Sequence, residues 1–360
     1  MQLWSWRVGV NPVIEIAGRR IGPGEPVYLV AELSANHNGS FERAELLVKA
    51  AAAAGADAIK IQTYRPDTMT LDCDSEYFRI GGDGLWAGRT LYDLYREAHM
   101  PWDWQPRLKR IAEDCGVHFF STPFDDTSVE FLQRMDVPAY KIASFELTDT
   151  PLLRAVAATG RPVLLSTGMA SIGEIEEAVD ALRAAGAKDI ALLKCTSAYP
   201  APLDEMNLRV IPVLAERFGV VAGLSDHTLS ETVPVAAVAV GTSIIEKHFT
   251  LSRADGGPDA AFSLEPEEFA RMVRAVRDAE RALGTVTFEH GPGETENRLF
   301  RRSLFVVADI RKGDVFTGDN VRAIRPGYGL PPGALDTVLG KRAAEDIKRG
   351  TPLRPELILP

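Results

Sequence analysis

Short apolar runs recur along the chain from residue 28 onward, and segments with helical spacing separate them. Arg43 to Ala54 and Ile172 to Ala184 carry apolar positions three and four residues apart, as in amphipathic helices. The apolar runs predict strands at Tyr28–Glu32, Ala58–Gln62, His118–Thr122, Ala139–Ser144, Val163–Thr167, Ile190–Thr196, Val220–Ser225 and Ser243–Phe249. Eight strands that alternate with helices predict an α/β fold, a (β/α)8 TIM barrel. A doubly wound sheet is the alternative, but no glycine-rich dinucleotide fingerprint follows the first strand.

The rest of the chain predicts an entry segment, a linker and a second domain. Residues 1–27 form the entry segment, with a small hairpin near 14–21, and the barrel domain covers residues 1–285. Residues 286–300 are the linker. From 301 to 360, short β-prone runs alternate with turn signals, which predicts a small loop-rich β domain. Inside this domain, DIRKGDVF from Asp309 weakly resembles DIKRGTPL from Asp346.

The interval between the second and third predicted strands is about twice the usual length. Its extra stretch, residues 65–104, contains LWAGRTLYDLYREAHMPWDW and follows the carboxyl end of a strand. In a barrel that end carries the active site. The stretch is therefore either a loop that covers the substrate or a surface helix with an apolar underside.

Composition narrows the class of partner. The 360-residue chain has a formal net charge of −10, which argues against nucleic acid or an anionic membrane as a partner. Its three cysteines, Cys73, Cys115 and Cys195, lack metal-type spacing and fit a reduced, cytoplasmic chain. No apolar run reaches the ~20 residues that span a bilayer, and the amino terminus lacks the pattern of a secretion signal. An anionic substrate would need a local group of lysines or arginines.

Two histidines end adjacent predicted strands. Ser225-Asp226-His227 follows the seventh apolar run, and Glu246-Lys247-His248 ends the eighth. Equivalent ends of neighbouring parallel strands lie side by side, so both imidazoles can reach one point. Two imidazoles with open positions suit a divalent cation that binds substrate or water, whereas a structural zinc site is closed. The alternative is that His227 and His248 are core or capping residues.

Lysines occur inside the predicted strands, where an ammonium group needs a partner. A cradle for phosphate or carboxylate is predicted from Lys60, Lys141, Thr122, Ser144 and Ser166. The alternative pairs these lysines with carboxylates on the outer face of the barrel. Lys194 and Lys247 are weaker candidates, and alternation along the strand points Lys247 away from His248.

Carboxylates complete the predicted pocket. Glu32 ends the first strand, Glu146 follows the fourth, and Asp259 closes the turn DGGPD that begins at Asp255. These groups suit a polar neutral substrate, although the turn could equally face solvent. The residues alone predict metal-assisted chemistry on a phosphorylated or carboxylated substrate.

Several motifs resemble the sialic acid synthase family. They are AELSANHNGS from Ala31, IKIQTY from Ile59, FFSTPFD from Phe119, YKIASFELTD from Tyr140, LLSTGMA from Leu164, LLKCTSAYPAP from Leu192, GLSDHT from Gly223 and EKHFTL from Glu246. The stretches LWAGRTLYDLYREAHMPWDW and FTLSRADGGPDAAFSLEP are most similar to the pseudaminic acid synthase branch. Residues 301–360 resemble the antifreeze-like module of these enzymes, a SAF (β-clip) domain.

The resemblance implies a reaction. C3 of phosphoenolpyruvate attacks an open-chain acetamido-sugar aldehyde, water adds at C2, and the C–O bond to phosphate breaks through a tetrahedral intermediate. For this branch the sugar is 2,4-diacetamido-2,4,6-trideoxy-altrose. An N-acetylneuraminate or legionaminate synthase is the alternative within the family. A carbohydrate-binding protein without turnover is the alternative outside it.

The resemblance also assigns roles at matching positions. His227 and His248 match ligands of a divalent metal, usually Mn²⁺ and alternatively Co²⁺ or Mg²⁺, which would polarise the aldehyde and lower the pKa of water. Glu32 matches a candidate general base. Contacts to phosphoenolpyruvate would come from Lys60, Thr122, Lys141, Ser144, Ser166, Ser197 and Ser225. Contacts to the sugar would come from Glu146, Tyr199, Asp259 and Arg325.

Arg325 has a further implication. In the family, the matching arginine reaches the barrel of the partner subunit, so the active enzyme would be a homodimer with swapped SAF domains. The sugar of this branch lacks a hydroxyl at C6 and carries a second acetamido group, which implies a more apolar pocket. Trp86, Tyr92 and Tyr95 of the long insertion are candidates for its wall.

Overall fold

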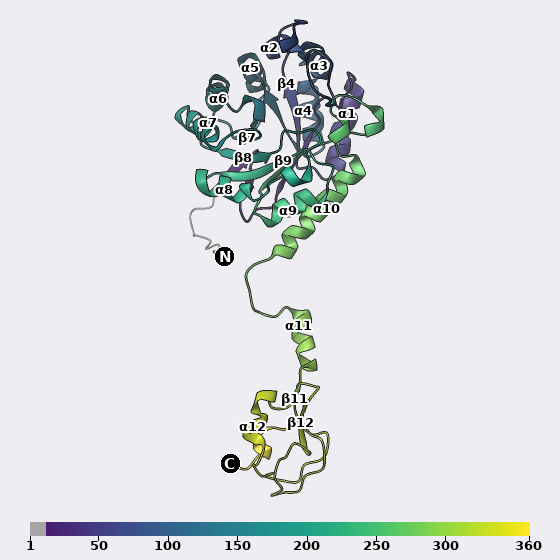
Figure 1. The fold of residues 1–360 in the computed structure, drawn as a ribbon, viewed down its shortest axis with the longest axis vertical. Coiled ribbons are helices and arrows are strands. Elements are labelled where there is room, and N and C mark those ends of the chain that lie inside the picture. Colours follow the sequence, from purple (N-terminus) through teal and green to yellow (C-terminus); the bar gives the residue numbers. More distant parts are fainter. Residues whose placement is uncertain (1–11) are drawn as a thin grey trace. The chain divides into compact units, whose positions relative to one another are not determined.

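Residues 12–360 are described by a computed structural model, in two compact units that divide after Gly284. The first unit is a closed barrel of parallel strands with helices around it (Figure 1). The strands follow one another around the barrel in chain order, and the last one pairs with the first to close it. Closure confirms the predicted (β/α)8 fold and excludes the doubly wound sheet.

The barrel strands lie close to their predicted positions. They are β3 (Tyr28–Glu32), β4 (Ala58–Thr63), β5 (His118–Pro123), β6 (Tyr140–Ile142), β7 (Val163–Ser166), β8 (Ile190–Cys195), β9 (Val221–Asp226) and β10 (Ile244–His248). β6 ends at Ile142 rather than at the predicted Ser144, because the chain turns there into the short 3-10 helix η2 (Ser144–Glu146). This turn places Glu146 at the carboxyl end of the barrel.

Capping residues set the helix boundaries. The helix predicted at 172–184 begins after Ser171, whose hydroxyl accepts from the N–H of Glu174, while Glu174 accepts in return from the N–H of Ser171. The hydroxyl of Ser40 accepts from the N–H of Arg43, without a reciprocal bond, and the first helix starts two residues earlier than predicted, at Phe41. The surrounding helices are α1 (Phe41–Ala53), α4 (Gln105–Asp114), α5 (Asp126–Arg134), α6 (Thr150–Ala157), α7 (Ile172–Ala184), α8 (Val210–Phe218), α9 (Thr232–Ala239) and α10 (Pro266–Leu283).

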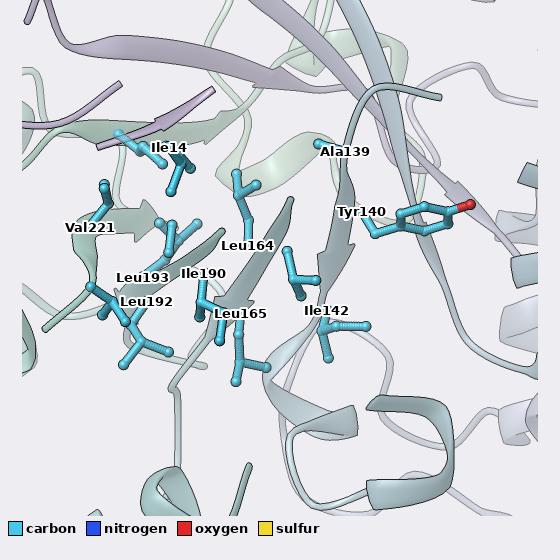
Figure 2. Packing of buried hydrophobic residues seen from close by; sticks show 14 of the residues in the cluster. Ile14, Ala139, Tyr140, Ile142, Leu164, Leu165, Ile190, Leu192, Leu193 and Val221 are labelled. Atoms are coloured by element: carbon cyan, nitrogen blue, oxygen red, sulfur yellow. The ribbon is translucent and has the colours of Figure 1, made fainter. Parts of the chain in front are cut away.

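The core has a layer between strands and helices and a layer that closes the amino-terminal end of the barrel. Leu29 and Ile59 are among the outward residues that pack against α1, α4 and α10. The hairpin β1 (Ile14–Ile16) and β2 (Arg19–Ile21) buries Ile14 in one cluster with Tyr28 at the start of β3. Figure 2 shows Ile14 of this hairpin with apolar side chains of β6, β7, β8 and β9. The hairpin thus lies at the end opposite to the catalytic face. Residues 1–11 of the predicted entry segment lie outside the described residues.

The long insertion after β4 contains α2 (Pro66–Met69), the 3-10 helix η1 (Glu76–Phe78) and α3 (Leu91–Ala98). Only Leu94 of α3 is buried, so α3 itself is a surface helix with an apolar underside, one of the two alternatives predicted for the insertion. Between η1 and α3, backbone hydrogen bonds from Ile80 to Arg89 and from Gly88 to Ile80 close a narrow loop.

The second unit is small and poor in helix. It contains α11 (Pro292–Asn297), the 3-10 helices η6 (Arg298–Phe300), η7 (Pro332–Ala334) and η8 (Pro355–Leu357), the strands β11 (Ser303–Val306) and β12 (Val321–Ile324), and α12 (Leu335–Val338). The two similar segments of the sequence pair with each other: Ile310 and Ile347 exchange both backbone hydrogen bonds, and Asp309 and Asp346 each accept a backbone N–H from the other segment. The weak repeat therefore reflects a local symmetry of the module.

Among the helices of residues 12–360, none is both long enough and apolar enough to cross a membrane.

Candidate active site

The register of neighbouring strands brings three polar residues together: His248, Glu32 and Lys60. His248 of β10 is level with Glu32 of β3, and Glu32 is level with Lys60 of β4. Level residues on parallel strands point to the same face. The ammonium group of Lys60 accordingly lies 2.7 Å from Oε2 of Glu32 and 3.4 Å from the hydroxyl of Thr122. The lysine predicted for the cradle is therefore inside the barrel and not on its outer face.

Glu246 lies between the two lysines of the predicted cradle. Its Oε1 is 3.1 Å from Nζ of Lys60, 3.7 Å from Nζ of Lys141 and 3.1 Å from the hydroxyl of Ser225. Lys141 also donates to the hydroxyl of Ser166 at 2.7 Å. The other oxygen of Glu246 is buried without a hydrogen-bond partner among the described residues. We refer to Lys60, Lys141, Thr122, Ser166, Ser225 and Glu246 as the lysine cradle.

Burial and charge give the two carboxylates of this region opposite pKa shifts. Burial raises the pKa of Glu32 to about 7, against the opposing charge of Lys60. Burial also opposes ionisation of Glu246, but the charges of Lys141 and Lys60 outweigh it and lower the pKa to about 2. Below pH 7 Glu32 is therefore protonated, and Glu246 is the ionised carboxylate beside the two buried lysines. Two lysine side chains and several hydroxyls around one carboxylate suit an anionic ligand.

Two hydroxyls meet at a third strand end. The N–H of Gly168, after β7, donates to the hydroxyl of Ser144 at 3.0 Å. A Cβ at Gly168 would lie 2.7 Å from that hydroxyl oxygen and would overlap the hydroxyl oxygen of Ser197. Glycine is thus required for the close approach of the loops after β6, β7 and β8. Ser144 and Ser197 are both half-buried at the same mouth as the lysine cradle.

The two predicted metal ligands face each other. The ring centroids of His227 and His248 are 5.2 Å apart. Nδ1 of His227 lies 3.1 Å from the carbonyl oxygen of Thr196, which can only accept, so Nδ1 carries a hydrogen and Nε2 is the nitrogen left to bind a cation. Burial and the nearby charges of His227 and the lysines hold the pKa of His248 well below its usual range, and its Nδ1 is buried without a partner among the described residues.

These observations fit a divalent cation held by two imidazoles. Contacts with Cys195 and the carbonyl of Thr196 raise the pKa of His227 against burial, so this ring would give up its second proton when it binds the cation. Such an ion needs a ligand lone pair from each ring. The ring of His248 also has a buried nitrogen, Nδ1, without a partner among the described residues. Within residues 12–360, no group of three or more His, Cys, Asp and Glu side chains could hold a metal ion. The two imidazoles would therefore leave most of the coordination sphere open for substrate or water.

Cys195 is a neighbour of His227 that the sequence did not assign to the site. Its buried sulfur lies 3.9 Å from Nδ1 of His227 and 3.7 Å from the hydroxyl of Ser197. Burial raises the pKa of this thiol, but the hydrogen bond and charge of His227 together with the hydroxyls of Ser144 and Ser197 outweigh burial and lower the pKa to about 6. Cys195 is level with Ser225 of the next strand, so the register of β8 and β9 would have indicated its position.

The predicted sugar contacts surround the imidazoles and the cradle. Glu146 has a buried carboxylate oxygen without a partner among the described residues, and burial raises its pKa to about 7. The ring of Tyr199 packs on His227 with centroids 4.5 Å apart. Asp259 accepts from the hydroxyl of Ser34, and burial raises its pKa. Asp259 therefore points inward, whereas Asp255, Gly256 and Gly257 of the same turn are exposed.

An aromatic wall that the sequence indicated only in part lies beside the histidines. Phe262 contacts His248 at a centroid distance of 4.8 Å and Tyr199 at 5.0 Å, and Trp86 of the insertion packs on both Tyr199 and Phe262. Tyr95 packs instead against Tyr64. Tyr92 donates to Asp67 on the surface of the insertion, so it is not part of this wall.

The remaining strand lysines lie outside the cradle. Lys247 donates to Asp226 at 2.6 Å on the outer side of the barrel, as the alternation of the strand predicted. Lys194 is half-buried and donates to the carbonyl of Cys195 and the hydroxyl of Thr196. Arg325 follows β12 in the second unit and is exposed there.

Fold and site together define a class of protein: a (β/α)8 barrel with buried lysines and paired imidazoles at the carboxyl ends of its strands, followed by a small β module. Comparison with known proteins makes the class specific. Residues 47–288 match the NeuB family, and residues 301–359 match the SAF domain.

Named relatives cover nearly the whole chain. A pseudaminic acid synthase of Campylobacter jejuni (strain 81-176) is 46% identical over 91% of this chain and 95% of its own length. A pseudaminic acid synthase of Helicobacter pylori is 41% identical over 91% of this chain and 97% of its own. The crystal structure of an N-acetylneuraminic acid synthetase from Leptospira borgpetersenii, 32% identical, superposes with a TM-score of 0.71 over 80% of this chain and 95% of that one. The chain belongs to the NeuB family, which confirms the resemblance to sialic acid synthases.

Proposed function

We propose that this chain condenses phosphoenolpyruvate with 2,4-diacetamido-2,4,6-trideoxy-altrose and water to give pseudaminic acid and phosphate. The observation that carries the proposal is the pair of buried ammonium groups, Lys60 and Lys141, at the same barrel mouth as the facing imidazoles of His227 and His248. The two ammonium groups suit a multiply charged anion, and a cation on the two imidazoles would suit the carbonyl of an aldehyde. The pseudaminic acid synthases among the relatives support the choice of sugar.

The lysine cradle would bind phosphoenolpyruvate. The phosphate and carboxylate groups of phosphoenolpyruvate need many N–H and O–H donors. Charge-assisted hydrogen bonds from ammonium groups are the strongest of these. The donors would be Lys60, Lys141, Thr122, Ser144, Ser166, Ser197 and Ser225. Because Glu246 is ionised among them, it would hold both ammonium groups in position before the anion enters.

Glu32 would act as the general base. A base works best when its pKa is near the working pH, and burial raises the pKa of Glu32 to about 7. C3 of phosphoenolpyruvate bonds to the aldehyde carbon as the π bonds of the enol and the aldehyde break, and the aldehyde oxygen takes up a proton to become a hydroxyl. Water then adds at the electron-poor C2 while Glu32 takes one of its protons. The C–O bond to phosphate breaks next, which leaves the keto group of the product and releases inorganic phosphate.

His227 and His248 would hold the metal, which we propose is Mn²⁺, with Co²⁺ or Mg²⁺ as alternatives. When bound there, it supplies Lewis acidity to the aldehyde oxygen. Hydrogen bonds to the hydroxyl and acetamido groups of the sugar would come from Glu146, Tyr199 and Asp259. The buried, unpaired carboxylate oxygen of Glu146 supports its role, because such an atom is costly to bury without a partner.

We further propose that the active form is a homodimer in which Arg325 of the partner subunit completes the sugar site. Arg325 is exposed on the SAF module and has no carboxylate within salt-bridge distance in the described residues. Two inactive variants, Lys60→Met and Arg325→Ala, would then regain part of the activity when mixed and allowed to exchange subunits. A monomer in light scattering that is fully active would contradict the shared site.

A panel of sugars tests the proposed function. Purified protein would be given phosphoenolpyruvate, Mn²⁺ and each of three aldoses: 2,4-diacetamido-2,4,6-trideoxy-altrose, N-acetylmannosamine and the sugar precursor of legionaminic acid. Phosphate release would be timed, and the product identified by mass spectrometry. We expect the first sugar to be preferred and the reaction to stop when a chelator removes the metal.

Other outcomes of the panel select the alternatives. Preferred turnover of N-acetylmannosamine or of the legionaminic acid precursor would replace the proposed substrate with that sugar. If phosphoenolpyruvate neither reacts nor binds in calorimetry, the protein would be a carbohydrate-binding protein without turnover. The variant His227→Ala should stay folded yet bind no Mn²⁺ in calorimetry, and unchanged Mn²⁺ stoichiometry in it and in His248→Ala would remove the metal assignment.

A further inference from the structure

A single side chain attaches the narrow loop of the insertion to the barrel. From Gly81 to Gly88, Trp86 is the one residue that is not exposed. Its indole N–H donates to the carbonyl oxygen of Pro258, 172 positions away in the sequence, at 2.9 Å. The loop is therefore held over the turn that carries Asp259 by one aromatic anchor.

Trp86 is the outer member of the aromatic wall. Its ring centroid lies 5.6 Å from that of Tyr199 and 6.4 Å from that of Phe262. Those two rings lie in turn against His227 and His248. Phe262 is only 1% exposed, whereas Trp86 and Tyr199 are half-buried. The part of the aromatic wall that a ligand could touch is therefore on Tyr199 and Trp86.

The chemistry of this wall differs from that of the lysine cradle. Ring faces bind C–H and methyl groups and cannot repay the desolvation of a hydroxyl. A sugar whose aldehyde end lies at the imidazoles would place its far end, carbons 4 to 6, beside Trp86. A methyl at C6 and an acetamido methyl at C4 suit this surface, and a hydroxymethyl group does not.

We infer that Trp86 is a specificity-determining residue that selects acceptor sugars with apolar groups at their far end. The inference rests on the proposed function for the orientation of the sugar and extends it to one residue outside the barrel strands. Trp86 would act through the binding of the acceptor alone, because the lysine cradle is built from other elements. Removing the ring should change the ratio between sugars and leave phosphoenolpyruvate binding unchanged.

The test compares two diacetamido sugars that differ only by a hydroxyl at C6. In Trp86→Ala we expect kcat/KM for the 6-deoxy sugar to fall by about 10–100-fold, the range for losing apolar contacts in a pocket. For the 6-hydroxy sugar we expect a smaller loss, of about threefold, because it keeps only the contact of its C4 acetamido methyl with the ring. Calorimetry with phosphoenolpyruvate should give the wild-type Kd.

Two further variants separate the ring from the loop. Trp86→Phe keeps a ring but cannot donate to Pro258, so it should retain most of the discrimination. Tyr77→Ala removes another aromatic ring of the same insertion that is 84% exposed, and it should behave as wild type. Equal losses for the two sugars in Trp86→Ala, or weaker phosphoenolpyruvate binding, would overturn the inference.

The proposed function and the inference can fail separately. The wild-type protein alone decides the function, through the sugar that it prefers. The inference is decided by how far Trp86→Ala changes the ratio of kcat/KM for the 6-deoxy sugar to kcat/KM for the 6-hydroxy sugar, relative to wild type. This comparison holds whichever sugar the wild type prefers. A wild-type preference for N-acetylmannosamine together with an unchanged ratio in Trp86→Ala would reject both.

Discussion

Lys141 and Lys247 are buried lysines on strands of the same barrel, 2% and 0% exposed, and burial lowers the pKa of both. Lys247 points outward and has three acceptors for its three N–H groups: Asp226 at 2.6 Å, Thr228 at 3.2 Å and Ser230 at 3.3 Å. Lys141 points inward. Its nearest carboxylate oxygen, on Glu246, is 3.7 Å away and is shared with Lys60.

The difference shows that burial alone does not mark a functional lysine. Lys247 has a close carboxylate of its own and complete hydrogen bonding, which is how a structural charge is held in an interior. The charge of Lys141 is incompletely neutralised and faces the mouth of the barrel, as expected for a group that awaits an anion. The two lysines should therefore respond to substitution in opposite ways, one in stability and the other in turnover.

The largest effect should come from Lys247→Met. The substitution leaves the carboxylate of Asp226 buried without its ammonium partner, which typically costs about 3–5 kcal/mol of stability. Denaturant unfolding followed by circular dichroism would measure the loss. The folded fraction should keep kcat/KM within about tenfold, because no atom of Lys247 faces the site.

A paired variant controls this prediction. In Asp226→Asn with Lys247→Met both charges are absent, and the amide keeps an acceptor for the N–H of Thr228, which Asp226 accepts at 2.8 Å. We expect the double variant to be more stable than Lys247→Met alone, because removing a buried pair together is often nearly neutral. If Lys247→Met were as stable as wild type, the pair would not have the structural role assigned to it.

The periodicity of the sequence predicted the barrel strands and the outward direction of Lys247. Alternation along β10 placed Lys247 outward, and the rhythm of apolar runs located every barrel strand. The same alternation puts Glu246 on the face of His248, yet nothing in the sequence shows that it lies between Lys60 and Lys141. Those lysines are on β4 and β6, far from β10 in the chain, so only closure of the barrel brings the three together.

The aromatic wall was harder to predict for a similar reason. Phe262 and Trp86 lie on loops whose positions depend on contacts across long stretches of chain, such as the bond from Trp86 to Pro258. Local pattern contains no information on such contacts. A turn after the last strand signals only that Asp259 is near the mouth, and Tyr92, equally aromatic, lies on the insertion surface.

The second prediction concerns Lys141→Met. Loss of one charged donor from a preorganised site should lower kcat/KM by roughly 10²–10³-fold. Stability should change by no more than about 1 kcal/mol, because Glu246 keeps Lys60 at 3.1 Å and Ser225 as partners. Phosphate release with saturating sugar and varied phosphoenolpyruvate would measure the first effect, and denaturant unfolding the second.

Lys194→Met is the matched control. Lys194 is also a strand lysine near a carboxyl end, but it donates only to Cys195 and Thr196 of its own strand end. Its loss should change kcat/KM by about threefold or less. Similar activity in Lys141→Met and Lys194→Met would erase the distinction between Lys141 and the strand lysines outside the cradle.

The smallest effect is a pH dependence of kcat/KM, which should come from Glu32 inside the barrel and not from the outward pair of Lys247 and Asp226. Burial raises the pKa of Glu32 to about 7, so its carboxyl is protonated below that pH and cannot act as a base. We expect kcat/KM to fall as the pH falls through about 7, approaching tenfold per pH unit. Glu32→Gln should lower the activity and remove this limb of the profile. Glu146→Gln should keep the limb although burial raises the pKa of Glu146 to about 7 as well.

As the pH rises, the stability of the protein should fall while its activity rises. This opposite change gives an independent check of Glu32 as the general base. A carboxyl whose pKa is raised on folding favours the folded state below its unfolded pKa, and this contribution is lost as the pH rises through the folded value. Wild type should therefore lose stability relative to Glu32→Gln between about pH 4.5 and pH 7, over the range in which its activity rises. The outward pair should add no such limb to the activity, because Lys247 and Asp226 touch neither substrate. A profile whose acid limb survives in Glu32→Gln but vanishes in Glu146→Gln would transfer the role of base from Glu32 to Glu146.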